Sequence, residues 1–112
     1  MEQKNKTLYE LDKGELVTVQ IVPTRVSQPH AQAALNGQPL PHSPSGELSF
    51  QFIFSGNETV LLIEGEFVNP QPDSRYDVRL SASNEEEKHG PTLNPEKKVV
   101  EIIFRTRTGP PK

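Results

Sequence analysis

The chain has 112 residues, of which 11 are proline and none is cysteine, and its formal net charge at pH 7 is −3. This length is typical of a single domain, and the proline content argues against long helices because proline breaks helix interiors. The absence of cysteine excludes disulfides, thiolate metal sites and a cysteine nucleophile, and it fits a reducing compartment. The mild negative charge, without a basic stripe, argues against binding nucleic acid through its phosphates.

The start of the sequence, Met1 to Lys6, is polar and leads into no apolar segment. A secretory signal peptide needs such a segment, so none is expected, and a cytoplasmic location is favoured over export. No apolar run approaches the ~18 residues of a membrane-spanning helix. We therefore expect a protein without a membrane span.

The N-terminal part of the chain is expected to contribute a tail, a strand and a hairpin. Residues 1–15 are polar, with both charge signs, and are expected to form a tail or a short edge segment that docks on a sheet. Residues 16–22 are predicted to form the first strong strand, ended by Pro23, with residues 23–29 as a connector. Within residues 31–40, Asn36-Gly37 predicts a hairpin because this pair adopts the positive φ angles of a type I′ turn.

Four further strands are expected at residues 47–55, 59–67, 75–83 and 99–107, because apolar side chains alternate along them. The run Val60-Leu61-Leu62-Ile63 is apolar on both faces, as expected where two sheets or a covering loop meet a strand. Residues 84–98 are polar and are expected to form a long loop. The side chains expected to pack together in the core are Phe50, Phe52, Phe54, Val78, Leu80, Ile102 and Phe104.

Six or seven short strands separated by turn signals, without a helical pattern, are typical of a sandwich or a barrel. We therefore predict an all-β fold, a single small β-sandwich of about seven antiparallel strands. The sandwich domain is expected to span residues 16–107, and residues 108–112 are expected to form a C-terminal tail.

The C-terminal half has a recognisable order of features. After Phe67, a corner that contains Pro70 and Pro72 leads into an alternating segment, and Gly90 lies in the polar stretch that follows. The alternating segment reads Tyr76-Asp77-Val78-Arg79-Leu80-Ser81-Ala82-Ser83-Asn84, and the last strand ends in Phe104-Arg105-Thr106-Arg107-Thr108.

This order, over about residues 59–108, resembles a fibronectin type III or related immunoglobulin-like domain. The resemblance implies that residues 76–84 form the penultimate strand. It also implies that Tyr76 is a corner tyrosine whose hydroxyl bonds backbone near residues 68–73. The family usually places a tryptophan on an early core strand, and this chain has none; Phe50 or Phe52 could fill that volume.

No pattern in the sequence indicates a metal site. His30, His42 and His89 lie in expected loops, and their spacing matches no metal-ligand motif. The acidic run Glu85-Glu86-Glu87 could bind a cation together with Asp73 or Asp77, but a charge run in a loop is usually solvated. We therefore predict no metal and no cofactor.

No pattern indicates catalysis either. There is no Gly-x-Ser-x-Gly elbow, so a nucleophilic triad is not expected. Glu64 and Glu66 would lie about 7 Å apart along one strand face, and an exposed sheet face explains them more simply than a pair of glycosidase carboxylates. We therefore expect that the protein is not an enzyme and has no catalytic residues.

Two functions are compatible with this sequence. The first is a non-catalytic interaction module that binds a partner protein, or a carbohydrate, through loops or a strand edge. The alternative is a structural subunit of a larger bacterial or phage assembly; a monomer in solution favours the module, a defined oligomer the subunit. Because charge is densest in the expected long loop, the candidate partner-binding residues are Asn84, Glu85, Glu86, Glu87, Lys88 and His89.

Overall fold

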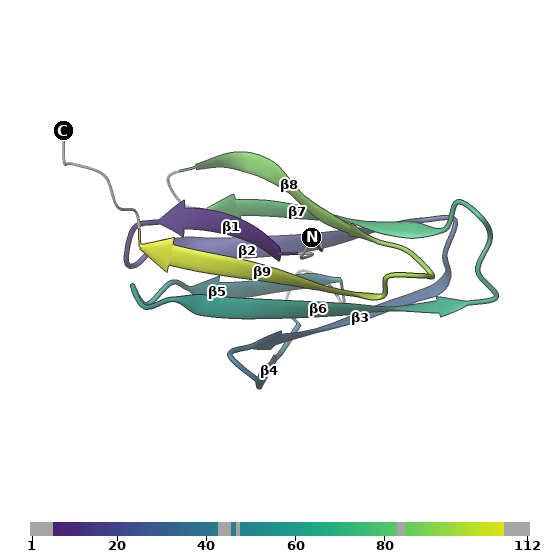
Figure 1. The fold of residues 1–112 in the computed structure, drawn as a ribbon, viewed down its shortest axis with the longest axis horizontal. Coiled ribbons are helices and arrows are strands. Elements are labelled where there is room, and N and C mark those ends of the chain that lie inside the picture. Colours follow the sequence, from purple (N-terminus) through teal and green to yellow (C-terminus); the bar gives the residue numbers. More distant parts are fainter. Residues whose placement is uncertain (1–5, 43–45, 47, 83–84, 107–112) are drawn as a thin grey trace, which may run out of the picture.

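The computed structural model describes residues 6–42, 46, 48–82 and 85–106. These residues form an all-β fold of two packed sheets and contain no helix (Figure 1). The nine strands are β1 (Lys6–Leu11), β2 (Leu16–Thr24), β3 (Ser27–Leu35), β4 (Gln38–Leu40), β5 (Ser49–Ile53), β6 (Thr59–Val68), β7 (Arg75–Ala82), β8 (Glu85–Leu93) and β9 (Val99–Thr106).

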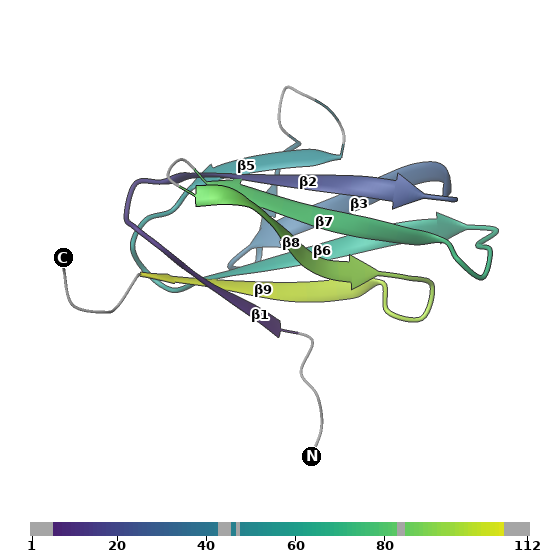
Figure 2. The same cartoon turned by 90° about the horizontal axis from the view of Figure 1, so that it is seen from above.

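The strands divide into a five-stranded sheet A, in the order β1-β9-β6-β3-β4, and a four-stranded sheet B, in the order β5-β2-β7-β8. Figure 2 shows the two layers, with β5 and β2 above β9 and β1. All neighbouring strands are antiparallel except β1, which pairs with β9 in parallel. The predicted sandwich class is confirmed, whereas the prediction of about seven antiparallel strands is wrong in number and in the direction of β1.

Strand β2 continues through Pro23 to Thr24, so the prediction that Pro23 ends this strand is wrong. The Ile21 N–H donates to Leu48 O, so odd-numbered residues of β2 turn their backbone groups toward β5. Strand β5 begins at Ser49, opposite Gln20, and therefore does not reach Pro23. The N–H that Pro23 lacks would therefore have had no partner on β5, and the proline breaks no hydrogen bond between strands.

The β3–β4 hairpin is confirmed, with Asn36 and Gly37 at φ angles of 51° and 84°. The expected connector over residues 23–29 is wrong, because β3 already begins at Ser27. Its pairing with β6 shifts register between Ser27 and His30, and Gln28 has a φ angle of 50°. A bulge of this kind adds a residue to one strand and interrupts the two-residue alternation, so the start of β3 cannot be recognised from the sequence pattern.

The expected long loop over residues 84–98 is also wrong, because Glu85–Leu93 form β8, which pairs with β7 at the edge of sheet B. Charged residues and Pro91 make this segment look like a loop, yet such residues are common on edge strands. Since β8 lies between β7 and β9 in the chain, the segment that begins at Tyr76 is not the penultimate strand, contrary to the expectation from the resemblance.

All seven predicted core side chains are buried. Phe52 of sheet B meets Phe104 of sheet A edge to face, with ring centroids 5.3 Å apart. Gly65 of β6 leaves room for the Tyr76 ring, because a Cβ at this position would lie 2.7 Å from the ring carbons Cδ2 and Cε2. Aromatic rings thus fill the space between the two sheets.

Within the N-terminal segment, Lys6–Leu11 form β1, which pairs with β9 at the edge of sheet A. Leu11 is buried, and Tyr9 stacks on Phe104 with ring centroids 5.9 Å apart. The Tyr9 hydroxyl donates to His89 O of β8 at 2.9 Å and so joins the edges of the two sheets. The expected C-terminal tail, residues 108–112, lies outside the described residues.

Candidate functional site

The outer face of sheet A, which is turned away from sheet B, carries neighbouring apolar side chains. Direct cross-strand register arranges most of them in two rows, one across β1, β9 and β6 and one across β6, β3 and β4. We call this set the sheet A patch. It contains Leu8, Ile103 and Val60 in the first row, Leu62, Ala34 and Pro39 in the second, and Val99 beside them.

The sheet A patch is exposed although most of it lies on β9, β6 and β3, the inner strands of the sheet. The exposed fractions of Leu8, Val99 and Leu62 are 50%, 47% and 38%. On β6 the neighbouring Leu61 and Ile63 point the other way and are fully buried against sheet B. No described segment packs over the outer face, so the apolar run of β6 is covered on one face only.

Part of the sheet A patch is hollowed. The hollow spans β3, β4, β6 and the start of β9, and its floor and walls include Ala34, Pro39, Leu62 and Val99. Gln32 and Glu64 complete the lining with polar groups. A shallow apolar depression with polar sides is suited to receive a side chain of another molecule.

The charges on this face are mostly negative. Glu64 and Glu66 of β6 and Glu101 of β9 lie on it, because they alternate with the buried residues of their strands. Arg105 also lies on this face, and its Nε is held 3.0 Å from Glu58 Oε1. The face therefore favours a positively charged partner.

Two of the three histidines come together at the open edge of the sandwich. The rings of His30 and His42 have centroids 6.3 Å apart, and His42 also packs on Phe50 at 4.9 Å. His42 Nε2 lies 3.2 Å from Ala31 O, whereas His30 Nδ1 lies 3.4 Å from Glu66 Oε2 without a hydrogen bond. His89 lies on β8, and the described residues contain no group of three or more His, Cys, Asp or Glu side chains that could hold a metal.

The Tyr76 hydroxyl ties β7 of sheet B to two strands of sheet A. It accepts from the His30 N–H at 2.9 Å and donates its single proton to Glu66 O at 2.6 Å, while His30 O lies 3.1 Å away as a second acceptor within reach. The expectation that the Tyr76 hydroxyl bonds backbone near residues 68–73 is wrong. Strand β6 extends to Val68, and the hydroxyl bonds Glu66 within this strand and His30 on β3, both in the facing sheet. Burial raises the pKa of Tyr76, and the His30 N–H lowers that pKa less than burial raises it.

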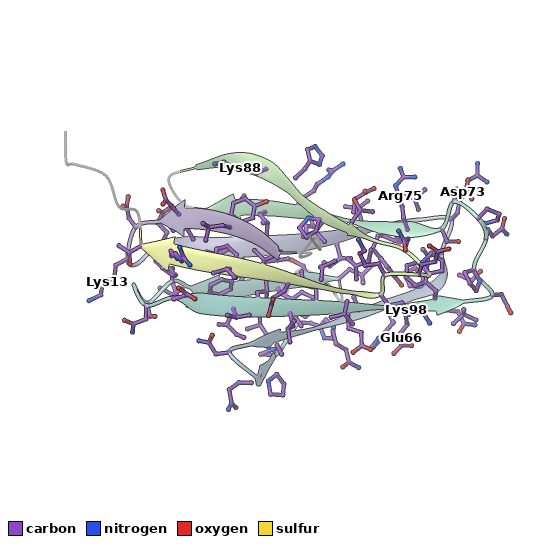
Figure 3. All side chains as sticks on the ribbon, viewed as in Figure 1. Lys13, Glu66, Asp73, Arg75, Lys88 and Lys98 are labelled. Atoms are coloured by element: carbon purple, nitrogen blue, oxygen red, sulfur yellow. The ribbon has the colours of Figure 1, made fainter. Side chains whose placement is uncertain are left out.

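Of the sequence-predicted partner-binding residues, Glu85 to His89 fall on strand β8. Lys88 and His89 are exposed there, and Figure 3 labels Lys88 on β8. Asn84 and the side chains of Glu85, Glu86 and Glu87 lie outside the described part of the structure. The candidates therefore belong to an edge strand that is fixed by pairing with β7, and not to a free loop.

The acidic residues considered as cation ligands have basic neighbours. Asp73 Oδ2 lies 2.6 Å from Arg25 Nε, and Asp77 Oδ2 lies 3.1 Å from Arg75 Nε. Glu64 and Glu66 are exposed on one face of β6, as the sequence predicted. None of these carboxylates shares a cleft with another acid in the described residues.

A small cavity lies between β1 and β8, beside Tyr9, Leu80 and Lys88. Its volume of about 20 Å³ is room for roughly one water molecule. It therefore cannot hold an organic substrate without a rearrangement of the two edges.

The sequence contained one sign of the sheet A patch. Val60 and Leu62 lie between the buried residues of β6, and on β9 Val99 precedes the first buried residue while Ile103 lies between the last two. Because the run from Val60 to Ile63 is apolar on both faces, we expected two sheets or a covering loop to meet this strand. Only the packing of the sheets reveals which face is left open.

The described residues contain no helix with the length and hydrophobicity that crossing a bilayer requires. Comparison of the chain with models of protein families, with curated proteins and with solved structures found no match.

Proposed function

We propose that the protein is a non-catalytic interaction module that binds a partner protein through the sheet A patch. The observation that carries this proposal is the run of apolar residues on both faces of β6, of which the described residues cover only the inner face. Neighbouring exposed apolar side chains mark interaction sites more often than isolated ones do. Binding to a partner would cover Leu62 and Val99.

The chemistry of the face supports a protein partner with basic and apolar side chains. Glu64, Glu66 and Glu101 surround apolar residues that would receive an aliphatic or aromatic side chain. A carbohydrate ligand is less well supported, because sugars commonly stack on exposed aromatic rings. The chain has no tryptophan, Tyr76 is fully buried and Tyr9 is stacked on Phe104.

A library of displayed random peptides tests this proposal without knowledge of the natural partner. We expect selected peptides to carry an apolar residue flanked by Lys or Arg, and their affinity to fall as salt is added. Leu62→Asp should weaken their binding at least about tenfold, which corresponds to about 1.4 kcal/mol. Since Leu62 is 38% exposed, the variant should keep the circular dichroism spectrum of the native fold.

The matched control is Lys88→Glu, which alters the exposed strand β8 on the other sheet. This variant should bind the selected peptides as the native protein does. Loss of binding in Lys88→Glu, with binding retained in Leu62→Asp, would place the site at Asn84–His89 and overturn the assignment to the sheet A patch.

A structural subunit of a larger bacterial or phage assembly is the alternative function. An assembly that grows needs two different complementary surfaces, since a symmetric contact between two copies closes on itself. A defined oligomer was expected to favour the structural subunit, but a symmetric dimer cannot grow, so only species larger than a dimer in sedimentation would favour it. A monomer or dimer favours the interaction module.

We also infer that the sandwich is a variant of the immunoglobulin-like arrangement. The order β9-β6-β3 in sheet A matches the G-F-C order of that fold, and β2 beside β5 matches its B and E strands. The place next to β2 where the first strand of such a fold lies is taken by β7. An experimental structure with a different strand order would contradict this inference.

A further inference from the structure

Among the edge strands β4, β5 and β8 of the described structure, β5 has the fewest features that protect an edge. Natural edge strands avoid pairing with other chains through prolines, charged residues, bulges or extreme shortness. Strand β4 has three residues with Pro39 at its centre, and β8 contains Lys88, Pro91 and two register shifts. Strand β5, Ser-Phe-Gln-Phe-Ile, has no charge, no proline and no register shift in its pairing with β2.

The backbone of β5 offers hydrogen-bonding groups on its outer side. Leu48 O accepts from Ile21 N, and the Phe54 N–H donates to Glu15 O, so even-numbered residues turn their backbone groups toward β2. The N–H and C=O of Ile53 therefore point away from the sheet. On this outer side the described residues form one isolated bridge, between His42 and Phe50, and a hydrogen bond from the Ser49 N–H to Gly46 O.

Exposed apolar side chains lie beside these backbone groups. Ile53 is the most exposed large apolar residue described, at 62%, and it lies opposite Leu16, which is 40% exposed. Both side chains are on the outer face of sheet B, next to its open edge. Figure 2 shows β5 as the outermost strand of that sheet.

We propose that two copies of this chain associate through antiparallel pairing of their β5 strands, with Ile53 on the two-fold axis. Each Ile53 N–H then donates to Ile53 O of the other copy, and the two four-stranded sheets join into one of eight strands. The two Ile53 side chains meet on the outer face and cover each other and the nearby Leu16 residues. A contact of this symmetry closes after two copies.

The distribution of charge favours a second copy as the occupant. The chain is negatively charged overall, and two sheet A faces would bring Glu64, Glu66 and Glu101 close to their counterparts. Strand β5 has no ionisable side chain, so copies can approach there without this repulsion. The sheet A patch stays free in such a dimer, and the dimer would present it twice.

Sedimentation at rising protein concentration provides the first test. The contact is small, so concentrations up to about 1 mM are appropriate. We expect the mass to rise toward twice the 12.5 kDa of one chain. Ile53→Pro should remain monomeric, because proline removes only the outward N–H, and Ile53→Lys should remain monomeric through charge repulsion. Two control variants should dimerise as the native protein does. They are Leu62→Asp and Val68→Lys, the latter at a 37% exposed residue of sheet A.

Cross-linking provides the second test, because the chain has no cysteine of its own. Residues that form a hydrogen-bonded antiparallel pair have Cα atoms about 5.5 Å apart, a separation that a disulfide can bridge. Ile53→Cys should therefore form a covalent dimer under mild oxidation at least tenfold faster than Val68→Cys. A native protein that stays monomeric at 1 mM, or equal cross-linking rates of the two variants, would overturn the proposal. Peptide binding to the sheet A patch is measured separately and is unaffected by either outcome.

Discussion

At the scale of single residues, Tyr76 links the two sheets through both its ring and its hydroxyl. Its ring fills the space beside Gly65 and lies 5.0 Å from the Phe67 ring, centroid to centroid. Its hydroxyl reaches backbone groups of His30 and Glu66 on the facing sheet. A buried hydroxyl with two backbone partners is costly to remove, since those partners lose their hydrogen bonds.

Tyr76→Phe is expected to lower the free energy of unfolding by about 1–3 kcal/mol, because buried backbone groups are left unpaired. Tyr9→Phe is the matched control. It removes one exposed hydrogen bond to His89 O and should cost less than about 1 kcal/mol. Urea denaturation of both variants measures the difference, and equal losses would show that the Tyr76 hydroxyl has no special role.

The same residue links stability to alkaline pH. Burial raises the pKa of Tyr76 above its ordinary value of 10.0, and the negative charge of Glu66 raises it further. The neutral phenol is therefore favoured in the folded protein, so its contribution is complete below about pH 10 and is lost as the pH rises through the folded-state pKa. In Tyr76→Phe the decrease in stability above pH 10 should be smaller.

At the scale of elements, the edges of the sheets decide what the sandwich can bind. Strand β1 covers one edge of sheet A by parallel pairing with β9, and the Tyr9–His89 hydrogen bond connects it to β8. On the opposite side, the described segment that follows β4 reaches β5 through the bridge of His42 to Phe50. The two sides thus differ in how much backbone they leave for another chain.

The docking of β1 can be tested with two leucines on the same strand. Leu11 is 5% exposed and Leu8 is 50% exposed. Leu11→Ala should destabilise the protein by about 2–5 kcal/mol, the usual range for a buried leucine, whereas Leu8→Ala should cost below about 1 kcal/mol. Similar values in thermal or urea unfolding would mean that β1 is not packed as described.

At the scale of the whole molecule, two sheets share one aromatic and aliphatic core. Phe52 and Phe104 meet across it, and no described helix contributes to it. Most of the apolar surface that the fold buries lies between the sheets, and the outer faces differ in character. The outer face of sheet A carries the apolar patch, while that of sheet B exposes chiefly Leu16 and Ile53.

Phe52→Ala should therefore destabilise the whole domain by about 3–5 kcal/mol, through loss of buried surface and creation of a cavity. The neighbouring Ile53→Ala, at a 62% exposed position, should change stability by less than about 1 kcal/mol. Unfolding is best measured at low protein concentration, where association through β5 does not contribute. A loss below 1 kcal/mol for Phe52→Ala would contradict the assignment of its face.

Alternation alone predicted the central strands, because a period of two reports burial against one face. It identified the core residues of β5, β7 and β9 and the turn at Asn36-Gly37. It failed at β8, where charged residues and proline suit an edge strand as well as a loop. It also failed at the start of β3, where the bulge at Gln28 interrupts the period.

The sequence by itself therefore determined the all-β class, the two-sheet core and the residues that fill it, since these follow from local alternation and side-chain volume. Tertiary structure alone decided the sheet order, the parallel docking of β1 and the partners of the Tyr76 hydroxyl, because these depend on pairings between segments far apart in the chain. It also decided that Leu62 and Val99 face outward and uncovered and that Ile53 lies at an open edge. A side chain's exposure depends on which other strands pack against its own, and local sequence does not contain that information.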